Sequence, residues 1–375
     1  MELTRPVWAE ISLLDIVHNY REVRRLVGSQ VRVMAIVKAN AYGHGAVEVA
    51  RALVEAGADC FGVAILNEAV QLREAGIEGP ILILGWTPTE DYVRALNYGI
   101  TLTIYSLEEA QVLSRKAIES QKKATVHLKI DTGMGRIGLA TDQETVKTVQ
   151  QILSLPGLEV EGIFTHLAKA DEKDKAFTSR QLGLFQDFIV QVETKSGYRF
   201  PLRHAANSAA IIDHPESYFD MVRPGIMLYG LNPSTDVQLS RVELRQAISL
   251  KAKISHIKTV PGGTPISYGG TYLTRKDEVI ASLPIGYADG YSRLLSGKGK
   301  VLWQGKQAPI VGRVCMDQTM FKASGLDVHK GDIVTLIGKD GDNYLSVDEL
   351  AQEMGTINYE VVCMISARVP RVYQR

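Results

Sequence analysis

Between about residues 30 and 230, short apolar runs alternate with longer segments whose apolar positions recur with helical spacing. Strands that alternate with helices predict a parallel sheet. Eight such units favour an α/β fold with a closed (β/α)8 barrel rather than an open sheet. The predicted strands are Val31–Val37, Phe61–Ile65, Ile81–Leu84, Ile100–Ile104, Thr125–Ile130, Glu161–Thr165, Pro201–His204 and Met221–Arg223. The clearest predicted helices are Ala46–Ala56, Asn67–Ala75, Leu107–Glu119 and Thr178–Thr194.

The pattern changes after Gly230, where residues 231–238 read as a linker. From Ala247 onward the apolar runs are β-branched and broken by glycine and proline, which predicts a mostly β C-terminal domain. Its predicted strands are Ile248–Val260, Val279–Pro284, Pro309–Val314 and Gly331–Ile337. The alternating segment Val7–Ser12 is expected to join that domain. The expected organisation is therefore residues 1–12 as a strand of the second domain, 13–235 as the barrel and 236–375 as the β domain.

Composition narrows the class of protein. The chain has 375 residues and a hydrophobic share of 45%, enough for two domains with sizeable cores. The 42 basic and 42 acidic residues cancel, which argues against a nucleic-acid groove or a membrane surface. No run is long enough to span a membrane, and residues 1–5 lack a signal-like apolar core, so we expect a soluble, cytoplasmic protein. Three scattered cysteines predict neither a disulfide framework nor a metal site.

Lys38 is the most informative residue of the sequence AIVKANAYGHG (35–45). It follows a buried strand and precedes a turn of small residues. A desolvated lysine loses its proton more easily and becomes a nucleophile for aldehydes. The alternative is a strand-end lysine that extends its ammonium to solvent.

Further polar residues lie at or just after the ends of predicted strands five to eight, where barrel active sites are built. They are Lys129, Asp131, Arg136, His166, His204, Asn207, Ser208 and Arg223. Ser208 and the Gly225-Ile226 backbone lie in the loops after strands seven and eight, the usual phosphate cradle of barrels. A phosphate site beside a reactive lysine suggests pyridoxal phosphate (PLP) held by Lys38.

The segment Gly133–Gly138 also matches the GxGxxG dinucleotide fingerprint. That fingerprint requires an immediate strand-to-helix turn in a first βαβ unit. Here Asp131-Thr132 intervenes and four units precede it, so a dinucleotide oxidoreductase is the weaker interpretation.

Taken together, the chain resembles the alanine racemase family, PLP enzymes of fold type III, nearly from end to end. The resemblance rests on AIVKANAYGHG (35–45), LKIDTGMGRIG (128–138), THLAKAD (165–171), HAANSAA (204–210), RPGIMLYG (223–230), ISYGGTY (266–272), GYADG (286–290) and GRVCMDQ (312–318). It implies an isomerase that interconverts L- and D-alanine and supplies D-alanine for peptidoglycan. It also implies a homodimer with shared active sites.

The resemblance implies roles for individual residues. Lys38 would carry the cofactor and act as one base, and Tyr268 of the partner subunit would be the second. Arg223 would face the pyridine nitrogen, with His166 linking it to the tyrosine. Arg136 would hold the phenolic oxygen of the cofactor and the substrate carboxylate, which the backbone of Met316-Asp317 from the partner subunit would also meet. Lys129 would be a carbamylated anchor for Arg136. Cofactor ligands would include Tyr42, Asn207, Ser208, Gly225, Ile226 and Tyr359, and the access corridor would be lined by Asp171, Tyr287, Arg293, Arg313 and Ile357. His44 and His204 are interpreted as structural.

Physical chemistry agrees with these roles. Racemisation removes a proton from one face of Cα and returns it on the other, for which two bases are the simpler device. A tyrosine, with an ordinary pKa of about 10, needs help to act near neutrality. An arginine stays protonated and so leaves the pyridine nitrogen unprotonated. An unmodified Lys129 would repel Arg136, whereas its carbamate would attract it.

Three alternatives remain. A fold type III PLP decarboxylase would prefer an acidic partner for the pyridine nitrogen, and Arg223 argues against it. A non-catalytic PLP carrier would not need the roughly 140 residues after the barrel. A racemase of broader specificity, acting on serine as well, differs only by small changes in the pocket.

Overall fold

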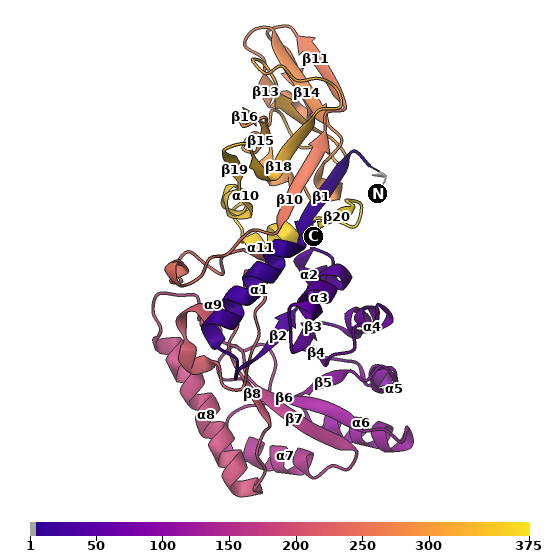
Figure 1. Ribbon diagram of the computed structural model, residues 1–375, viewed down its shortest axis with the longest axis vertical. Coiled ribbons are helices and arrows are strands. Elements are labelled where there is room, and N and C mark those ends of the chain that lie inside the picture. The colour runs from indigo at the N-terminus through magenta and orange to yellow at the C-terminus, as the bar shows by residue number, and fades with distance from the viewer. Residues whose placement is uncertain (1–4) are drawn as a thin grey trace.

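The computed structural model describes residues 5–375 as two domains, a barrel and a mostly β domain (Figure 1). Residues 1–4, which include most of the segment inspected for a signal and the start of the predicted strand 1–12, lie outside the described part. The long helix α1 (Leu13–Val27) leads from the β domain into the barrel.

Eight parallel strands form the barrel, in the order β8-β7-β6-β5-β4-β3-β2-β9. Backbone hydrogen bonds from Asp220 N to Arg203 O and from Arg223 N to Ala206 O, both 3.0 Å, join the two ends of this order. The predicted (β/α)8 fold followed by a mostly β domain is thus confirmed. The strands are β2 (Arg32–Ile36), β3 (Cys60–Val63), β4 (Ile81–Ile83), β5 (Thr101–Ile104), β6 (Ala124–Lys129), β7 (Leu158–Phe164), β8 (Leu202–His204) and β9 (Met221–Val222).

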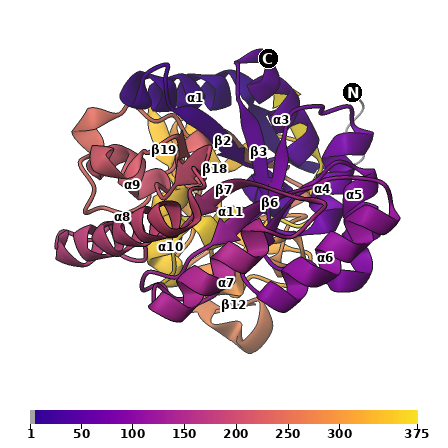
Figure 2. The same ribbon diagram turned by 90° about the horizontal axis from the view of Figure 1, so that it is seen from below.

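Helices cover the outside of the barrel, as the view from below shows (Figure 2). Several begin at the capping residues that their sequences supply, including Ser12 before α1 and Ser106 before α6, whose hydroxyls accept backbone N–H groups. These helices are α3 (Ala46–Glu55), α4 (Leu66–Glu74), α5 (Tyr92–Asn97), α6 (Leu107–Glu119), α7 (Gln143–Leu153), α8 (Ala176–Ser196) and α9 (Ser208–Asp213).

The second domain contains three sheets. The largest has the order β16-β15-β18-β10-β1-β20, with β19 paired to β18. The segment β1 (Val7–Ser12) pairs with β10 and β20, so the first described strand and the last lie side by side. The strands are β10 (Ile248–Lys253), β11 (His256–Val260), β12 (Pro265–Ile266), β13 (Tyr272–Leu273), β14 (Glu278–Leu283), β15 (Lys300–Trp303), β16 (Lys306–Pro309), β17 (Thr319–Lys322), β18 (Ile333–Asp340), β19 (Asn343–Leu345) and β20 (Arg371–Gln374).

Two strand predictions in this domain were wrong. The run 248–260 is two strands, because the chain passes from one sheet to another after Lys253. The predicted strand Pro309–Val314 ends at its first residue, because the chain turns at Gly312, whose φ is +69°. Two helices, α10 (Val347–Met354) and α11 (Asn358–Met364), were not predicted from the β-rich texture.

Short 3-10 turns carry several residues of interest. They are η1 (Thr89–Asp91), η2 (Pro215–Ser217), η3 (Ile226–Tyr229), η4 (Leu239–Arg241), η5 (Tyr268–Gly270), η6 (Tyr287–Asp289) and η7 (Arg293–Leu295). Within residues 5–375, no helix combines the length and the apolar character needed to cross a membrane.

Candidate active site

A cavity of about 650 Å³ opens at the C-terminal ends of the barrel strands. It brings together most of the residues predicted from the sequence. Its lining includes Lys38, Tyr42, Lys129, Arg136, His166, Asp171, Asn207, Ser208, Arg223, Gly225, Ile226, Ile357 and Tyr359. Lys129 is the last residue of β6, and Lys38, His166 and Arg223 follow β2, β7 and β9 closely.

Lys38 enters the cavity at the start of an unusual turn, α2 (Lys38–Tyr42). Ala39, Asn40, Ala41 and Tyr42 all have φ between +51° and +54°, so the chain forms one left-handed turn without glycine. Each such residue costs roughly 1–2 kcal/mol. Glu68 supports the turn by accepting the Ala39 N–H at 2.6 Å, and the Asn40 side chain accepts the first N–H of α3 at 2.9 Å. Strain of this kind concentrates at functional sites.

The cavity carries an excess of positive charge. Lys38, Lys129, Arg136 and Arg223 line it, with Asp171 as the acidic lining residue. Among the described residues, neither Lys38 nor Arg136 has a side-chain hydrogen bond or ion pair. Burial, and then Arg136, lower the pKa of Lys38. Such a cavity is suited to an anionic ligand with a group that a neutral amine can attack.

The phenols of Tyr42 and Tyr359 add two hydrogen-bond donors to the cavity lining. Burial is the main cause that raises the pKa of both, so the hydroxyls keep their protons and can donate. Neither hydroxyl has a hydrogen-bond partner within the described chain. A Cβ at Gly225 would lie 2.7 Å from the Tyr42 oxygen, so glycine leaves the space into which that phenol points. Ser208 Oγ accepts the Gly225 N–H at 2.9 Å and joins the two loops.

Lys129 is buried beside Arg223 and Arg136. Burial, followed by the charge of Arg223, lowers its pKa to about 7. Its ammonium donates to the Ile130 carbonyl at 2.7 Å and lies over the Phe164 ring. Close to neutrality, much of this lysine is therefore a free amine.

The loop that carries Arg136 is held by Asp131. The Asp131 carboxylate accepts the N–H groups of Gly133 and Met134 at 2.9 Å, and that of Gly135 at the same distance. After β6, the next helix of the described chain is α7, which begins only at Gln143. The Gly133–Gly138 segment thus lacks the immediate strand-to-helix turn of a dinucleotide site.

Arg223 is buried and fixed by four acceptors. It donates to the carbonyls of Thr165 at 2.8 Å and Ala205 at 3.0 Å, and to the ring nitrogens of His204 at 2.8 Å and His166 at 3.3 Å. Burial, and then Arg136, lower the pKa of Arg223 to about 9, so it remains a cation at neutrality. The His204 contact was missed in the sequence, where that histidine was interpreted as structural. The sequence feature that could have indicated this contact is the position of His204, a polar residue at the end of a barrel strand.

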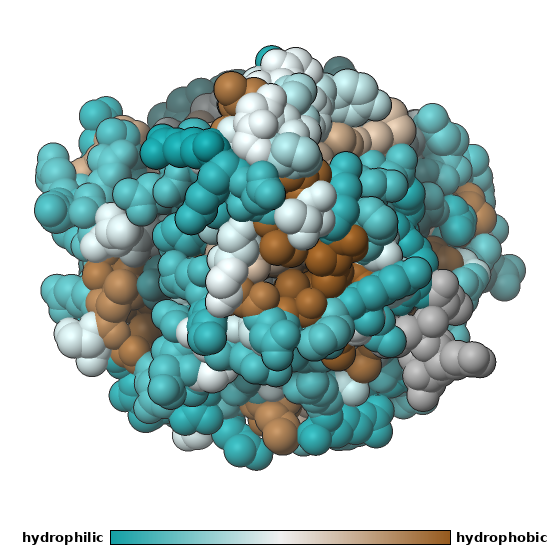
Figure 3. Space-filling model, turned by 90° about the horizontal axis from the view of Figure 1, so that it is seen from above, coloured by the Kyte–Doolittle hydropathy of each residue, from teal (hydrophilic) through white to brown (hydrophobic). Residues whose placement is uncertain are grey.

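The remaining predicted residues form a second group on the β domain, apart from the cavity lining. Tyr268, Tyr287 and Met316 are 71%, 41% and 53% exposed. Tyr287 N donates to Cys315 O at 3.0 Å, and Ser267 Oγ donates to Arg313 O at 2.7 Å, which ties their loops together. Arg293 begins η7, and Asp317 forms an ion pair with Arg368. Viewed from above, this end of the molecule has hydrophobic surface surrounded by hydrophilic surface (Figure 3).

Cys363 also lines the cavity, although nothing in the sequence singled it out. It lies on α11, a helix that the sequence pattern did not predict. The residue is solvent-exposed, but partial burial of the thiol raises its pKa, so less of it is thiolate near neutrality.

Family models relate nearly the whole chain to known proteins. The model described as "Alanine racemase, N-terminal domain" matches residues 11–233, and "Alanine racemase, C-terminal domain" matches residues 247–373. A protein of Methanococcus maripaludis named alanine racemase is 49% identical over 372 residues, which cover 99% of each chain.

Solved structures agree. An alanine racemase of Clostridium difficile has a TM-score of 0.95 and 44% identity, covering 100% of this chain and 97% of its own. An alanine racemase of Bartonella henselae, described with covalently bound pyridoxal phosphate, has a TM-score of 0.86 and 31% identity, with coverage of 98% and 99%.

Proposed function

The chain belongs to the alanine racemase family of isomerases, and on that premise we propose that it interconverts L-alanine and D-alanine with bound PLP. The observation that carries the proposal is the placement of Lys38. Its amine has a lowered pKa and faces a cavity with excess positive charge and a cradle of phenol donors. That arrangement suits an aldehyde that bears a phosphate.

The residues present fit PLP. Lys38 would bind the aldehyde carbon, and Tyr42, Ser208, Gly225, Ile226 and Tyr359 would surround the phosphate, with Asn207 beside them. The Bartonella henselae relative is described with this cofactor covalently bound. When bound, PLP withdraws electrons from the substrate Cα and weakens its C–H bond.

Arg136 would bind the substrate carboxylate. No acidic side chain pairs with it among the described residues, so its guanidinium is free to accept an anion. Lys129 lies close enough for Arg136 to lower its pKa. A neutral Lys129 amine can take up carbon dioxide as a carbamate, and the anion formed would then hold Arg136 in place.

Two bases on opposite faces of Cα would move the proton. Lys38 is one. Tyr268 would be the other, supplied by a second copy of the chain, because its ring is exposed on the β domain and does not line this cavity. A homodimer with two shared sites follows, in which Met316 of the partner would approach the substrate carboxylate.

His166 is prepared to assist such a tyrosine. Burial is the first cause that lowers the pKa of His166 well below its ordinary value, so the ring is neutral. The contact from Arg223 to Nδ1 leaves the hydrogen on Nε2. That N–H can donate to a phenolic oxygen and stabilise its deprotonated form.

Arg223 separates this proposal from a PLP decarboxylase. Facing the pyridine nitrogen, an arginine keeps that nitrogen unprotonated and makes the ring a weaker electron sink. Arg223 would in that way favour rapid return of the proton to the substrate Cα. This favours racemisation over reactions that need a long-lived anion.

Substrate choice is the finer part of the proposal. Alanine is proposed first, and serine would be excluded only by close packing in the pocket, since small groups discriminate by about 1–3 kcal/mol. The access corridor would run past Asp171 and Ile357 of one chain and Tyr287, Arg293 and Arg313 of the other. The product D-alanine would serve peptidoglycan synthesis in the cytoplasm.

A chiral assay tests the proposal. The purified protein is loaded with PLP and given L-alanine, L-serine or buffer, and both enantiomers are measured over time. We expect L-alanine to approach an equal mixture, with Lys38→Ala inactive. Carbon dioxide release without D-alanine would instead indicate a decarboxylase.

A further inference from the structure

A chain of hydrogen bonds crosses the barrel interior beneath the proposed site. Arg223 Nη1 lies 2.8 Å from His204 Nδ1, and His204 Nε2 lies 2.8 Å from His127 Nδ1. His127 Nε2 lies 3.0 Å from Glu161 Oε2. The proposed function assigns no task to His127, His204 or Glu161.

Both ends of this chain fix the direction of its hydrogens. A guanidinium only donates and a carboxylate only accepts. If both imidazoles are neutral, His204 Nδ1 must accept from Arg223, so His204 carries its hydrogen on Nε2 and donates to His127. His127 in turn carries its hydrogen on Nε2 and donates to Glu161. One arrangement alone satisfies all three contacts.

The charges are consistent with that arrangement. Burial, followed by the positive charge of Arg223, lowers the pKa of His204 well below its ordinary value, so its ring is neutral. The hydrogen bond from His127 is the first cause that lowers the pKa of Glu161, and Arg32 adds to the effect. Lys129 also faces His204 and disfavours a second proton there. Glu161 is therefore the anion at the end of the chain.

The barrel is shaped around these rings. A Cβ at Gly162 would lie 2.7 Å from the His127 ring, so this glycine makes room for it. The register between β6 and β7 shifts at Val126/His127, next to the same ring. The Phe164 ring stacks on His204 with centroids 4.7 Å apart and planes 5° apart. The rings therefore have little freedom to rotate out of the chain.

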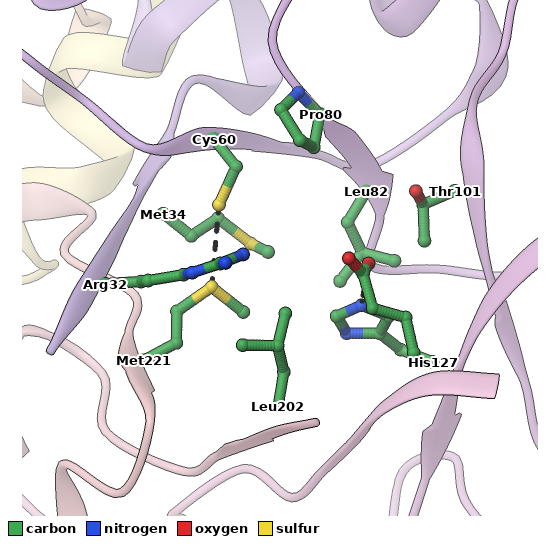
Figure 4. Close-up of a pocket in the computed structure, with 10 residues that line it drawn as sticks. Arg32, Met34, Cys60, Pro80, Leu82, Thr101, His127, Leu202 and Met221 are labelled. Carbon is green, nitrogen blue, oxygen red and sulfur yellow. Dashed lines mark hydrogen bonds and ion pairs between the residues drawn. The ribbon is translucent and has the colours of Figure 1, made fainter. Parts of the chain in front are cut away.

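Glu161 lies at the opposite end of the barrel from the proposed site. It borders a separate cavity of about 20 Å³. Figure 4 shows that cavity between Met34, Leu82, Leu202 and Met221, with His127 at its edge. Within the described residues Arg223 forms no ion pair of its own. The hydrogen-bond chain that starts at Arg223 passes through two imidazoles and ends at Glu161, which is therefore the anion connected to this guanidinium.

We propose that Glu161 and His127 are positioning residues, which act through His204 to orient the Arg223 guanidinium and balance its buried charge. This proposal rests on the proposed function, since Arg223 is taken to face the cofactor. Neither Glu161 nor His127 touches the cavity in which the substrate would bind. They act by fixing which ring nitrogen of His127 and of His204 carries the hydrogen.

The test compares three variants. Glu161→Gln keeps an oxygen that can accept from His127 but removes the charge, and Glu161→Leu removes both. Glu159→Gln is the matched control, because Glu159 lies two residues earlier on β7 and is exposed. Among residues 5–375 its one ion pair is with Lys123 on the surface.

The first readout does not depend on activity. Nitrogen NMR of histidine-labelled protein without cofactor reports which ring nitrogen carries the hydrogen, with signals assigned through His127→Gln. We expect the Nε2–H form for His127 and His204 in the wild type, in Glu159→Gln and in Glu161→Gln. We expect Glu161→Leu to show a mixture of forms at His127. Unchanged signals in Glu161→Leu would overturn the proposal.

The second readout is turnover of alanine by the PLP-loaded protein across pH. We expect kcat to fall about tenfold in Glu161→Leu, with KM nearly unchanged and a shifted pH profile, and a smaller loss in Glu161→Gln. Wild-type rates and profile in both Glu161 variants would overturn the proposal. If neither the wild type nor any variant racemises alanine, the proposed function is wrong. The NMR result still decides whether Glu161 determines which ring nitrogens of His127 and His204 carry hydrogen. If Glu161→Leu does not fold, Glu161→Gln carries the kinetic test.

Discussion

Arg223 Nη2 lies 3.3 Å from Nδ1 of His166, and this contact determines which ring nitrogen of His166 can donate. A guanidinium has no acceptor, so His166 must present a lone pair to it and keep its hydrogen on Nε2. One residue thereby serves two groups. Arg223 would set the protonation of the cofactor ring and, through His166, support the second base.

Replacement of Arg223 by glutamate should therefore alter the course of the reaction. A carboxylate would share a proton with the pyridine nitrogen and strengthen the electron sink. We expect Arg223→Glu to keep PLP, to racemise alanine about a hundredfold more slowly, and to form more pyruvate by transamination. Chiral analysis and a pyruvate assay measure both changes.

The control for this experiment is Arg115→Glu, the same substitution on the exposed side of α6. It should behave as the wild type. Unchanged racemisation by Arg223→Glu, with no additional pyruvate, would show that Arg223 does not face the pyridine nitrogen.

Borohydride reduction of the PLP-loaded protein should attach the cofactor to Lys38. Two lysines line the cavity with lowered pKa values, Lys38 and Lys129, so both are chemically able to react. Lys129, however, is turned toward the Ile130 carbonyl, to which it donates at 2.7 Å. Peptide mapping should find the pyridoxyl group on Lys38, and Lys38→Ala should carry none. A label on Lys129, or on Lys251 of the β domain, would contradict the assignment.

Much of the barrel could be predicted because its strands are short apolar runs that must be buried on both faces. The helical spacing of apolar residues in Leu107–Glu119 was enough to predict both ends of a helix, because α6 has the same bounds. In contrast, Ile248–Val260 reads as one strand because its pattern does not show that the chain changes sheets after Lys253. A turn within an apolar run depends on tertiary packing, which periodicity does not encode.

In the candidate site, too, some residues could be identified from the sequence and others could not. Lys38, Lys129 and Arg223 could be found because charged residues at the ends of buried strands are costly without a role. The left-handed turn Ala39–Tyr42 could not, because alanine and tyrosine rarely adopt positive φ and only tertiary support such as Glu68 makes it tolerable. His127 and Glu161 lie within strands, where the sequence does not reveal that their side chains meet across the barrel.

Lys129 should make folding depend on pH. In the unfolded chain a lysine takes up its proton near pH 10.4, whereas in the folded protein Lys129 does so only near pH 7. Between these values the unfolded state binds more protons, so stability rises with pH. Lys129→Met should therefore stabilise the cofactor-free protein by more than about 1 kcal/mol below pH 7. The gain should shrink toward pH 10.

Denaturant unfolding in buffer free of carbon dioxide measures this difference. Lys123→Met is the control, because it is the same substitution at a lysine whose side chain is exposed on the surface of the barrel. Added bicarbonate should stabilise the wild type but not Lys129→Met, and isotope-labelled bicarbonate should give a carbamate signal that is lost in the variant. Equal pH profiles for the wild type and Lys129→Met would mean that Lys129 is not the shifted lysine.

Subunit sharing can be tested by restoring activity from two inactive chains. Lys38 lines the cavity of the barrel, whereas Tyr268 is 71% exposed on the β domain and is not among the residues around that cavity. If each site combines Lys38 of one chain with Tyr268 of the other, Lys38→Ala and Tyr268→Phe each damage both sites of their homodimers. A mixed dimer has one site with both bases and one with neither. Random exchange makes about half of the dimers mixed, so racemisation should recover to roughly a quarter of the wild-type rate.

Two Lys38→Ala samples with different affinity tags provide the control for exchange, and they should recover nothing. If exchange is demonstrated and the mixture of Lys38→Ala with Tyr268→Phe also stays inactive, Tyr268 either acts within its own chain or is not the second base.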